Sequence, residues 1–574
     1  MKPDELLARL DPEQAAVARA IDGPVVVLAG AGTGKTRAIT HRMAYAAAVG
    51  AHDPYRTMAV TFTNRAAGEM TRRLAELGVE GVRVRTFHAA ALKQLAWAWP
   101  QVIGGEMFQL TPSKAGSLAN ASARLGLGSE VAFLRDVASE IEWAKVSQVT
   151  PDDYASVAAT KSRLAPGGLE REKIAELYEE YERIKSESHR IDFEDVLLLT
   201  VGILESRPEI REQVQKSFRH FTVDEFQDVS GIQSRLLDAW LGRRDDICVV
   251  GDPAQTIYSF AGADASFLQS FGRRFADSTM VRLARCYRCT PEVVDVATGV
   301  LVKSATPARL QSMKPAGPRV TYAVFDDELA EADSVAEQIK ELRASGVSAR
   351  DIAILVRINA MTEPFEAALA ERQIPYSVRG GLRFFDRPEV RQAISLIRGA
   401  AKASTVVNGQ DQEDLGRLTR AILTGVGWSD EPPVDIGAER ERWESIAALV
   451  TLADDVAARD SKATLVDLAG EIDHRKSTQD APEVDGVTIA SLHSAKGMEW
   501  DNVFLVGLSE GVMPFSQAET PDQLAEEQRL LYVGITRAAD RLALSSASTR
   551  GPGARTRRPS RFLPKLQLAA DSKS

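Results

Sequence analysis

A glycine-rich segment at residues 29–36 carries the clearest chemistry in the sequence. It follows the apolar run 25–28, so the pattern predicts a buried strand, a tight turn and the start of a helix. Glycines let backbone N–H groups point at phosphate oxygens, while Lys35 can reach the terminal phosphates and the Thr36 hydroxyl can bind magnesium. We therefore predict a nucleoside triphosphate site formed by Ala29, Gly30, Ala31, Gly32, Thr33, Gly34, Lys35 and Thr36.

Two adjacent carboxylates, Asp224 and Glu225, follow the apolar stretch 221–223. Acidic pairs are common as solvated loop charges, but a pair at a strand end downstream of a phosphate loop has a catalytic use. One carboxylate can hold magnesium and the other can polarise an attacking water. We predict that Asp224 is a metal ligand together with Thr36 and that Glu225 is the base, which implies hydrolysis rather than binding alone.

Two series of short apolar stretches predict the sheets that position these residues. Helical patterns lie between the stretches, which implies parallel strands joined by helices. The predicted fold class is α/β, with two parallel-sheet domains that each carry a mainly helical insertion. The first series is 25–28, 58–61, 82–85, 221–223 and 247–250, and the second is 319–324, 351–356, 487–490 and 503–506.

The two insertions are long breaks in these series. Residues 89–187 have helical periodicity, for example at 169–185, and we expect Trp97, Trp99 and Trp143 in their core. Residues 399–485 carry helical patterns and a Gly-rich segment at 425–427, which could be a turn or a duplex contact. Residues 546–561 are rich in Ser, Gly, Pro and Arg, which predicts a loop, and the last residues should be frayed.

The composition excludes several classes of protein. With 574 residues, 44% hydrophobic and 26% charged, the chain should fold as a multidomain globular protein, and no apolar run reaches the ~20 residues of a membrane span. The start lacks the build of a secretory signal, so we expect a cytoplasmic protein. Cys286 and Cys289 form a C-x-x-C, but no second Cys or His pair stands at zinc spacing. The net charge of -10 does not show whether the protein binds nucleic acid, because such binding needs only a local basic groove.

Further motifs, taken with the two above, resemble those of the UvrD/Rep/PcrA family of superfamily 1 DNA helicases. Each motif has modest specificity, but the whole set in this order is hard to obtain by chance, and the match runs from about residue 10 to residue 563. Within the family, segments 33–40 and 258–263 are most similar to the second UvrD-type helicases of actinobacteria, without their extra C-terminal domain. The motifs are residues 10–14, 61–67, 86–89, 223–228, 251–258, 286–288, 492–499 and 532–538.

The resemblance implies two RecA-like motor domains that use ATP and magnesium to step along one DNA strand in the 3′-to-5′ direction. The first motor domain would be residues 1–88 and 188–280, with 89–187 inserted. The second would be residues 281–398 and 486–566, with a reduced insertion at 399–485 and a flexible tail at 567–574.

The resemblance also assigns roles around the nucleotide. It implies that Gln14 reads adenine, that Arg37 and Tyr287 sandwich the base, and that Glu499 holds the ribose. Gln255 would sense the γ-phosphate, with Arg288 and Arg537 as a charge clamp. Lys35, Glu225, Gln255, Arg288 and Arg537 are thus the expected catalytic set.

For the DNA track, the resemblance implies contacts from seven positions. Base stacking suits a motor, because an aromatic face stabilises any base by about 1–3 kcal/mol without reading sequence. Each aromatic side chain could instead pack in an ordinary hydrophobic core. The positions are Phe62, Asn64, His88, Tyr258, Phe260, Arg357 and His493.

Two departures from the family pattern leave alternatives open. Ser259 and Ala261 stand where relatives often carry arginines, and the insertion 399–485 is short. The leading hypothesis is an ATP-dependent 3′-to-5′ DNA helicase of repair or replication that acts at single-strand/duplex junctions. One alternative is a translocase that mainly displaces proteins from DNA, and another is a non-catalytic accessory protein that binds DNA or a polymerase. We expect repair or replication proteins as partners, no membrane association, and a monomer in solution that could dimerise on DNA.

Overall fold

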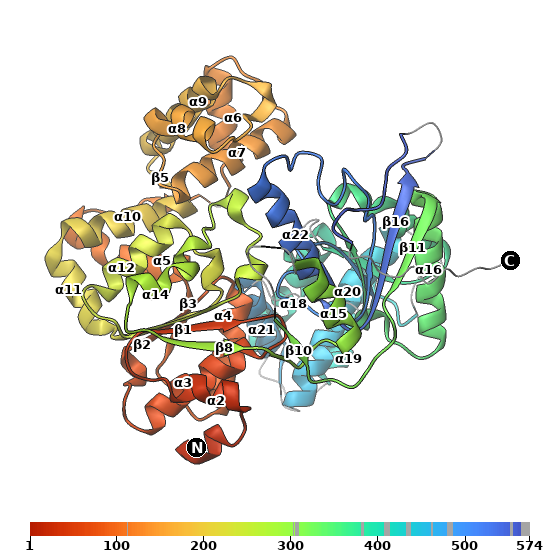
Figure 1. Cartoon of the computed structure of the whole chain (residues 1–574), viewed down its shortest axis with the longest axis horizontal. Coiled ribbons are helices and arrows are strands. Elements are labelled where there is room, and N and C mark those ends of the chain that lie inside the picture. Colours follow the sequence, from red (N-terminus) through yellow and green to blue (C-terminus); the bar gives the residue numbers. More distant parts are fainter. Residues whose placement is uncertain are drawn as a thin grey trace. The chain divides into compact units, whose positions relative to one another are not determined.

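The computed structural model describes residues 1–111, 113–301, 304, 309–379, 384–406, 414–431, 438–460, 463–478, 486–551 and 555–563. The chain divides into two compact units, Met1–Ala284 and Arg285–Ser574 (Figure 1). Each unit contains one large parallel sheet. In the described part of the chain, no helix is long and apolar enough to cross a membrane. The expected tail 567–574 lies outside the described residues.

The first unit is built on a six-stranded parallel sheet of order β3-β2-β6-β7-β1-β8. Val25 and Val27 pack on one face and Val26 on the other, so both faces of the sheet are buried. Such strands are apolar throughout rather than alternating, which is why the sequence reveals them. The strands are β1 (Val25–Ala29), β2 (Thr57–Thr61), β3 (Arg83–Thr86), β6 (His220–Val223), β7 (Ile247–Gly251) and β8 (Thr279–Leu283).

Helices cover both faces of this sheet. Apolar residues of α2, α3 and α4 form one core cluster with the sheet, and those of α5, α10, α11 and α12 form the other. Three shorter helices, α1 (Pro3–Leu7), α13 (Ser266–Gln269) and α14 (Phe271–Arg274), complete this part. The covering helices are α2 (Pro12–Arg19), α3 (Lys35–Ala48), α4 (Asn64–Glu76), α5 (Phe87–Val102), α10 (Phe193–Ser206), α11 (Pro208–Ser217) and α12 (Gly231–Leu241).

Four helices of the first unit form a group of their own, which stands apart from the strands in Figure 1. They share a separate apolar cluster that includes Trp143, Tyr154 and Tyr181. Two short strands, β4 (Gln109–Leu110) and β5 (Arg190–Ile191), pair in parallel where the chain enters and leaves the group. The helices are α6 (Ala115–Arg124), α7 (Val131–Val146), α8 (Pro151–Thr160) and α9 (Arg171–Glu187).

The second unit is also built on a six-stranded parallel sheet, of order β11-β16-β15-β12-β14-β13. Helices α16 (Glu328–Ala344) and α17 (Glu363–Glu371) share a core cluster with it, while α15 (Pro291–Leu301) and α22 (Pro521–Ile535) contact each other and β16. A small pair, β9 (Arg285–Cys286) and β10 (Gln311–Ser312), lies outside the sheet. The strands are β11 (Thr321–Asp327), β12 (Ile352–Val356), β13 (Tyr376–Arg379), β14 (Val487–Ser491), β15 (Trp500–Leu505) and β16 (Ala538–Thr549).

The insertion of the second unit is a helical cluster with its own apolar core. It contains α18 (Pro388–Val406), α19 (Leu415–Leu423), α20 (Ala438–Arg459) and α21 (Leu465–Thr478). The Gly-rich segment 425–427 lies directly after α19, where a short 3-10 helix ends at Gly427 with a φ of 98°. A left-handed glycine at this place terminates a helix, so the segment is a turn in the structure.

Three proposed boundaries fall inside elements of the structure. The boundary at 88/89 falls within α5, whose buried residues join the core of the first sheet, and the boundary at 280/281 falls within β8. The boundary at 398/399 falls within α18, which packs with α19–α21. Secondary structure elements are units of packing, so we propose that the first insertion begins after Val102 and the second before α18.

Two other expectations were wrong. Trp97 is 42% exposed, whereas Trp99 is buried, because residues two apart on a helix point in different directions. Residues 546–549 belong to β16 instead of a loop, since their Ser-rich composition hides a strand that pairs with β11. Edge strands β8 and β13 and the inner strand β16 were also missed, because none of them has a long apolar run.

A buried ion network ties the helical group of the first unit to α10. The Lys145 ammonium on α7 contacts carboxylates of Asp192 at 2.9 Å and Asp195 at 2.6 Å, and Lys185 on α9 contacts the same two residues. Asp192 also caps the N-terminus of α10. Burial opposes charge on Asp192, but the two lysines outweigh burial and hold its pKa well below the usual range. The network therefore stabilises the fold above about pH 4, the unfolded-state value, and this contribution is lost as the pH falls further.

Lys145→Ala should open this junction. Removal of one partner leaves buried carboxylates short of a cation, which costs about 3–5 kcal/mol. Hydrogen exchange of α7 and α9 peptides at pH 7 should accelerate accordingly. Lys173→Ala is the matched control, because Lys173 forms an exposed pair with Glu176 on α9 that contributes about 0.5 kcal/mol or less. Equal acceleration in both variants would contradict this role of the network.

Candidate active site

The predicted residues of the first unit gather at one edge of its sheet. All six strands are parallel, so the loops that follow them leave the same, carboxyl edge, where α/β proteins bind ligands. The phosphate loop follows β1, Phe62 and Asn64 follow β2, His88 follows β3, Asp224 and Glu225 follow β6, and Gln255, Tyr258 and Phe260 follow β7.

The phosphate loop has the geometry expected of an anion cradle. Gly32 and Gly34 have φ values of 70° and 76°, which only glycine adopts without strain, and Gly34 caps α3, which begins at Lys35. The Thr33 hydroxyl donates to the Gly30 carbonyl at 2.8 Å and fixes the turn. The first N–H groups of α3 are thus available for phosphate oxygens, whereas Ala29 and Ala31 are buried and can contribute only backbone. Thr36, the expected second magnesium ligand, lies in the first turn of α3.

Gln14 packs directly against this loop. The residue is buried on α2, and its side-chain amide donates to the Thr33 carbonyl at 3.1 Å. Asp11 caps α2 by accepting from the backbone N–H of Gln14. A side chain at position 34 would meet the Gln14 amide nitrogen at 2.7 Å. Gln14 can therefore hold this position only because residue 34 has no side chain.

An ion pair joins the phosphate loop to the acidic pair after β6. The Lys35 ammonium lies 2.9 Å from a Glu225 oxygen. Burial tends to lower the pKa of Lys35, but the carboxylates of Glu225, Asp224 and Asp252 outweigh it and raise that pKa. The lysine is therefore charged at pH 7 and presents a cation to the loop.

Asp224 and Glu225 have different surroundings. Asp224 is 5% exposed, and burial together with the nearby Glu225 raises its pKa to about 7. Glu225 has a φ of 50°, a conformation that costs a non-glycine residue about 1–2 kcal/mol. Strain of this kind persists where neighbours hold the residue, and here Lys35 is one of them.

Gln227 is the second neighbour, and the sequence analysis did not identify it. Its fully buried amide donates to the other Glu225 oxygen at 2.5 Å and accepts from the backbone N–H of Asp252 at 3.0 Å. Asp252 in turn accepts from the Gln255 amide at 2.7 Å. A chain of hydrogen bonds thus runs from Glu225 to Gln255. An uncharged glutamine gives no electrostatic signal, although its place two residues after Glu225 in the 223–228 motif was a usable clue.

Magnesium and a nucleoside triphosphate fit the residues of the first unit. The cradle offers N–H donors and one lysine, which suits phosphate oxygens, and Thr36 and Asp224 offer the oxygen ligands that magnesium prefers. Bound magnesium would neutralise developing negative charge on the phosphates. Glu225 lies within reach of Lys35 and would accept a proton from water.

In the second unit, the expected nucleotide residues lie at the amino edge of the sheet. Glu499 precedes β15 and Arg537 precedes β16, while Arg288 follows β9. Arg288 pairs with Glu499 at 2.5 Å and donates to the Thr536 carbonyl at 3.2 Å. Tyr287 is 43% exposed, as a stacking residue requires.

Arg537 donates its hydrogen bonds within its own unit, whereas a charge clamp is expected to face the γ-phosphate. Its guanidinium is only 2% exposed and donates to the carbonyls of Val533 and Met498, both at 2.9 Å. In this unit it holds the segment before β15 against the end of α22. Its predicted contact with a γ-phosphate therefore remains a prediction.

The expected DNA contacts of the first unit include exposed aromatic and polar side chains. Phe260 is 52% exposed and meets Tyr258 edge to face at 6.1 Å, and Asn64 is exposed at the start of α4. Phe62 is half-buried against the core and contacts Phe87. Phe62 thus packs against the core, and its contact with DNA stays a prediction.

His88 has an aromatic neighbour that the sequence analysis missed. Its ring meets Phe193, which is 45% exposed at the start of α10, at 6.2 Å. Burial and the Lys114 charge lower the pKa of His88 to about 4. The imidazole is therefore neutral at pH 7, which favours stacking or a hydrogen bond over an ion pair with phosphate.

The expected DNA contacts of the second unit lie at the carboxyl edge of its sheet, after β12 and β14. Arg357 binds Glu527 through two hydrogen bonds, of 2.5 and 3.0 Å, and stands over the Phe515 ring. Burial, Arg357 and Lys496 lower the pKa of His493 to about 4. Two cations, Arg357 and Lys496, thus act on a His493 ring that is neutral at pH 7, and Lys496 was not among the expected contacts.

The fold and the site define a P-loop NTPase with two RecA-like cores. Residues 10–276 match the family model of the UvrD/REP helicase N-terminal domain, and residues 281–431 and 428–549 match that of the UvrD-like helicase C-terminal domain. The chain belongs to the UvrD/REP helicase family.

Curated relatives agree with this assignment. The chain is 45% identical to "ATP-dependent DNA helicase UvrD2" of Mycobacterium tuberculosis, over 98% of the chain and 82% of the relative. It is 28% identical to "ATP-dependent DNA helicase PcrA" of Bacillus subtilis, over 95% and 84%, and 29% identical to "ATP-dependent DNA helicase UvrD1" of Mycobacterium bovis, over 95% and 83%. The protein is a helicase of the UvrD type, and the expected likeness to the second actinobacterial UvrD-type helicase is confirmed.

Gly34→Ala should weaken nucleotide binding more than its backbone strain explains. The new methyl group would displace the Gln14 amide, in addition to the cost of about 1–2 kcal/mol for a left-handed alanine. Gly23→Ala is the matched control, because Gly23 has a φ of 66° but nothing within 4 Å of the added carbon. The melting temperature should fall similarly in both variants, whereas the affinity for a fluorescent nucleotide should fall only in Gly34→Ala. The same loss of affinity in both would exclude the proposed role of Gln14.

Proposed function

We propose that the protein is an ATP-dependent DNA helicase that moves along single-stranded DNA in the 3′-to-5′ direction and unwinds duplexes during repair or replication. Single-strand/duplex junctions are its expected substrates, and magnesium is its expected cofactor. The family assignment and the names of the relatives support ATP and DNA as the partners.

One observation supports coupling between the two ligands. The segment after β7 carries Gln255, which is linked by hydrogen bonds to Glu225, and three residues later Tyr258, which contacts exposed Phe260. Two short 3-10 helices, Pro253–Gln255 and Ser259–Ala261, leave little slack between them. A shift of Gln255 with the state of the γ-phosphate would therefore be transmitted to the aromatic pair.

The roles of individual residues follow from the site. Lys35 and the N-terminus of α3 would hold phosphates, Thr36 and Asp224 would hold magnesium, and Glu225 would take the proton of the attacking water. Gln14, Arg37, Tyr287 and Glu499 would hold adenine and ribose, and Arg288 with Arg537 would supply charge that depends on domain closure. Phe62, Asn64, His88, Tyr258, Phe260, Arg357 and His493 would contact DNA.

A translocase that mainly removes proteins from DNA is the second candidate. The alignment to PcrA extends over 627 positions, which exceeds the 574 residues of this chain, so PcrA has insertions relative to it. The short helical cluster α18–α21 is consistent with a reduced unwinding apparatus. Strong protein displacement with little strand separation would favour this candidate.

Glu225→Gln should separate binding from hydrolysis. Loss of the general base should lower the DNA-stimulated ATPase rate by about 10²- to 10⁴-fold, while a fluorescent nucleotide should still bind. Glu209→Gln, an exposed glutamate of α11, should retain the wild-type rate. Wild-type ATPase activity that does not rise with single-stranded DNA would refute the proposed function.

Phe260→Ala should weaken binding of single-stranded DNA. Loss of one stacking face costs about 1–3 kcal/mol, or about 5- to 150-fold in Kd measured by fluorescence anisotropy at fixed salt. Trp97→Ala is the control, because Trp97 is comparably exposed but is not among the expected DNA contacts. Unchanged affinity for Phe260→Ala would place Phe260 off the DNA track.

A further inference from the structure

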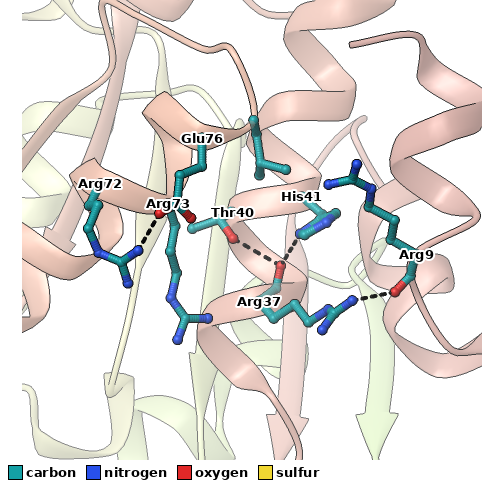
Figure 2. A pocket seen from close by; sticks show the side chains of 8 residues that line it. Arg9, Arg37, Thr40, His41, Arg72, Arg73 and Glu76 are labelled. Atoms are coloured by element: carbon teal, nitrogen blue, oxygen red, sulfur yellow. Dashed lines mark hydrogen bonds and ion pairs between the residues drawn. The ribbon is translucent and has the colours of Figure 1, made fainter.

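A basic depression lies along α3 in the first unit, where Arg37, Thr40 and His41 line it (Figure 2). It has a volume of ≈ 280 Å³ and is lined by residues of α3, α4 and the segment after α1. No residue of the phosphate loop, 29–36, lines it. The depression is therefore separate from the cradle that holds Lys35.

Guanidinium groups dominate this depression. Arg9, Arg37, Arg72 and Arg73 line it, against one lining carboxylate, Glu76. Arg72 pairs with Glu76 and Arg73 pairs with Glu69, both as neighbours on α4. Arg37 instead donates to the Arg9 carbonyl at 2.6 Å, and among the described residues neither Arg37 nor Arg9 pairs with a carboxylate. The depression keeps a positive charge in a chain whose net charge is -10.

His41 supplies an independent sign of a ligand. The residue is 7% exposed, and its Nδ1 lies 2.9 Å from the Arg37 carbonyl. A carbonyl only accepts, so Nδ1 carries the proton and Nε2 of the neutral ring is an acceptor. Nε2 is buried and has no hydrogen-bond partner within the described structure. Burial lowers the pKa of His41, and Arg37, Arg9 and Arg73 lower it further, which keeps the ring neutral and the acceptor vacant.

We propose that this depression, which we call the arginine pocket, binds a small phosphate anion. Guanidinium groups form paired, charge-assisted hydrogen bonds with phosphate oxygens. His41 lines the same pocket and adds a neutral ring with a vacant acceptor, which suits a partly protonated phosphate better than a fully ionised one.

The phosphates of the DNA track are a poorer match for the arginine pocket. Asn64, the expected DNA contact on α4, begins that helix, whereas Arg72 and Arg73 lie eight and nine residues later. At 1.5 Å per residue this separation is about 12 Å along the helix. A free anion such as pyrophosphate is small enough for the pocket and need not follow the track.

Calorimetric titration with inorganic pyrophosphate, without magnesium, tests the proposal. The phosphate loop also binds phosphate, so the titration uses the Lys35→Ala protein as its background. Binding should persist there and should weaken about tenfold or more when Arg72→Gln and Arg73→Gln are added, since two charge-assisted contacts are lost. These substitutions remove only surface ion pairs and leave Arg37, a proposed nucleotide contact, unchanged.

The matched control is Arg124→Gln with Arg183→Gln in the same background. Both arginines form exposed ion pairs in the helical group, so the charge change is identical. The control should bind pyrophosphate as tightly as its parent. Loss of all binding in Lys35→Ala alone, or equal weakening by both pairs of substitutions, would overturn the proposal.

A DNA arm distinguishes the two sources of phosphate. Anisotropy with a labelled oligonucleotide should give the same Kd for the wild type and for the Arg72→Gln, Arg73→Gln variant. If this variant loses oligonucleotide affinity and keeps pyrophosphate affinity, the pocket belongs to the DNA track and the proposal is wrong.

Discussion

The ion pair between Lys35 and Glu225 is the contact on which the site of the first unit depends. It joins the end of β1 to the end of β6, and it holds Glu225 in a left-handed conformation together with Gln227. The same cation lowers the repulsion between Glu225 and Asp224, whose pKa is raised to about 7 by burial and by the neighbouring Glu225. A nucleotide would compete with Glu225 for Lys35, and the displaced carboxylate would then be free to act on water. Nucleotide binding and activation of the base would thus be linked through one lysine.

The parallel arrangement of the strands explains why the nucleotide residues of the first unit lie at the same edge of the sheet as the expected DNA residues. Every functional loop of the first sheet leaves the carboxyl edge, where the expected DNA residues follow β3, β2 and β7 and the expected nucleotide residues follow β6, β7 and β1. In the second unit the expected nucleotide residues and the expected DNA residues lie at opposite edges of the sheet. Arg288 and Glu499 lie at the amino edge, and Arg357 and His493 lie at the carboxyl edge. The first sheet therefore carries both sets of expected contacts on one edge, and the second sheet carries them on opposite edges.

The sequence predicted those features that have a local signature. Strands buried on both faces appear as apolar runs, and the phosphate loop needs glycines at fixed places, so β1, β6 and β12 were found. Edge strands such as β8 pack on fewer neighbours and lack that run. The expected burial of Trp97 was wrong, because the prediction rested on its apolar side chain and ignored the direction in which that side chain points from the helix.

Residues that act through distant partners escaped prediction. Gln227 and Lys145 are ordinary types in the sequence, and only the fold brings them to Asp252 and to Asp192. Arg357 was placed from the resemblance at a phosphate, yet the structure also gives it Glu527 as a partner. Local chemistry can be recognised in the sequence, whereas pairing across 25 to 170 positions requires the folded chain.

The claim that hydrolysis at Lys35 drives movement along a strand is tested most directly by streptavidin displacement from end-labelled oligonucleotides. Strands carrying biotin at the 5′ or the 3′ end are compared, with ATP and excess free biotin. A motor that moves 3′ to 5′ should clear streptavidin from the 5′ end much faster than from the 3′ end, and Lys35→Ala should clear neither. Equal release from both ends, or release that persists in Lys35→Ala, would contradict the account.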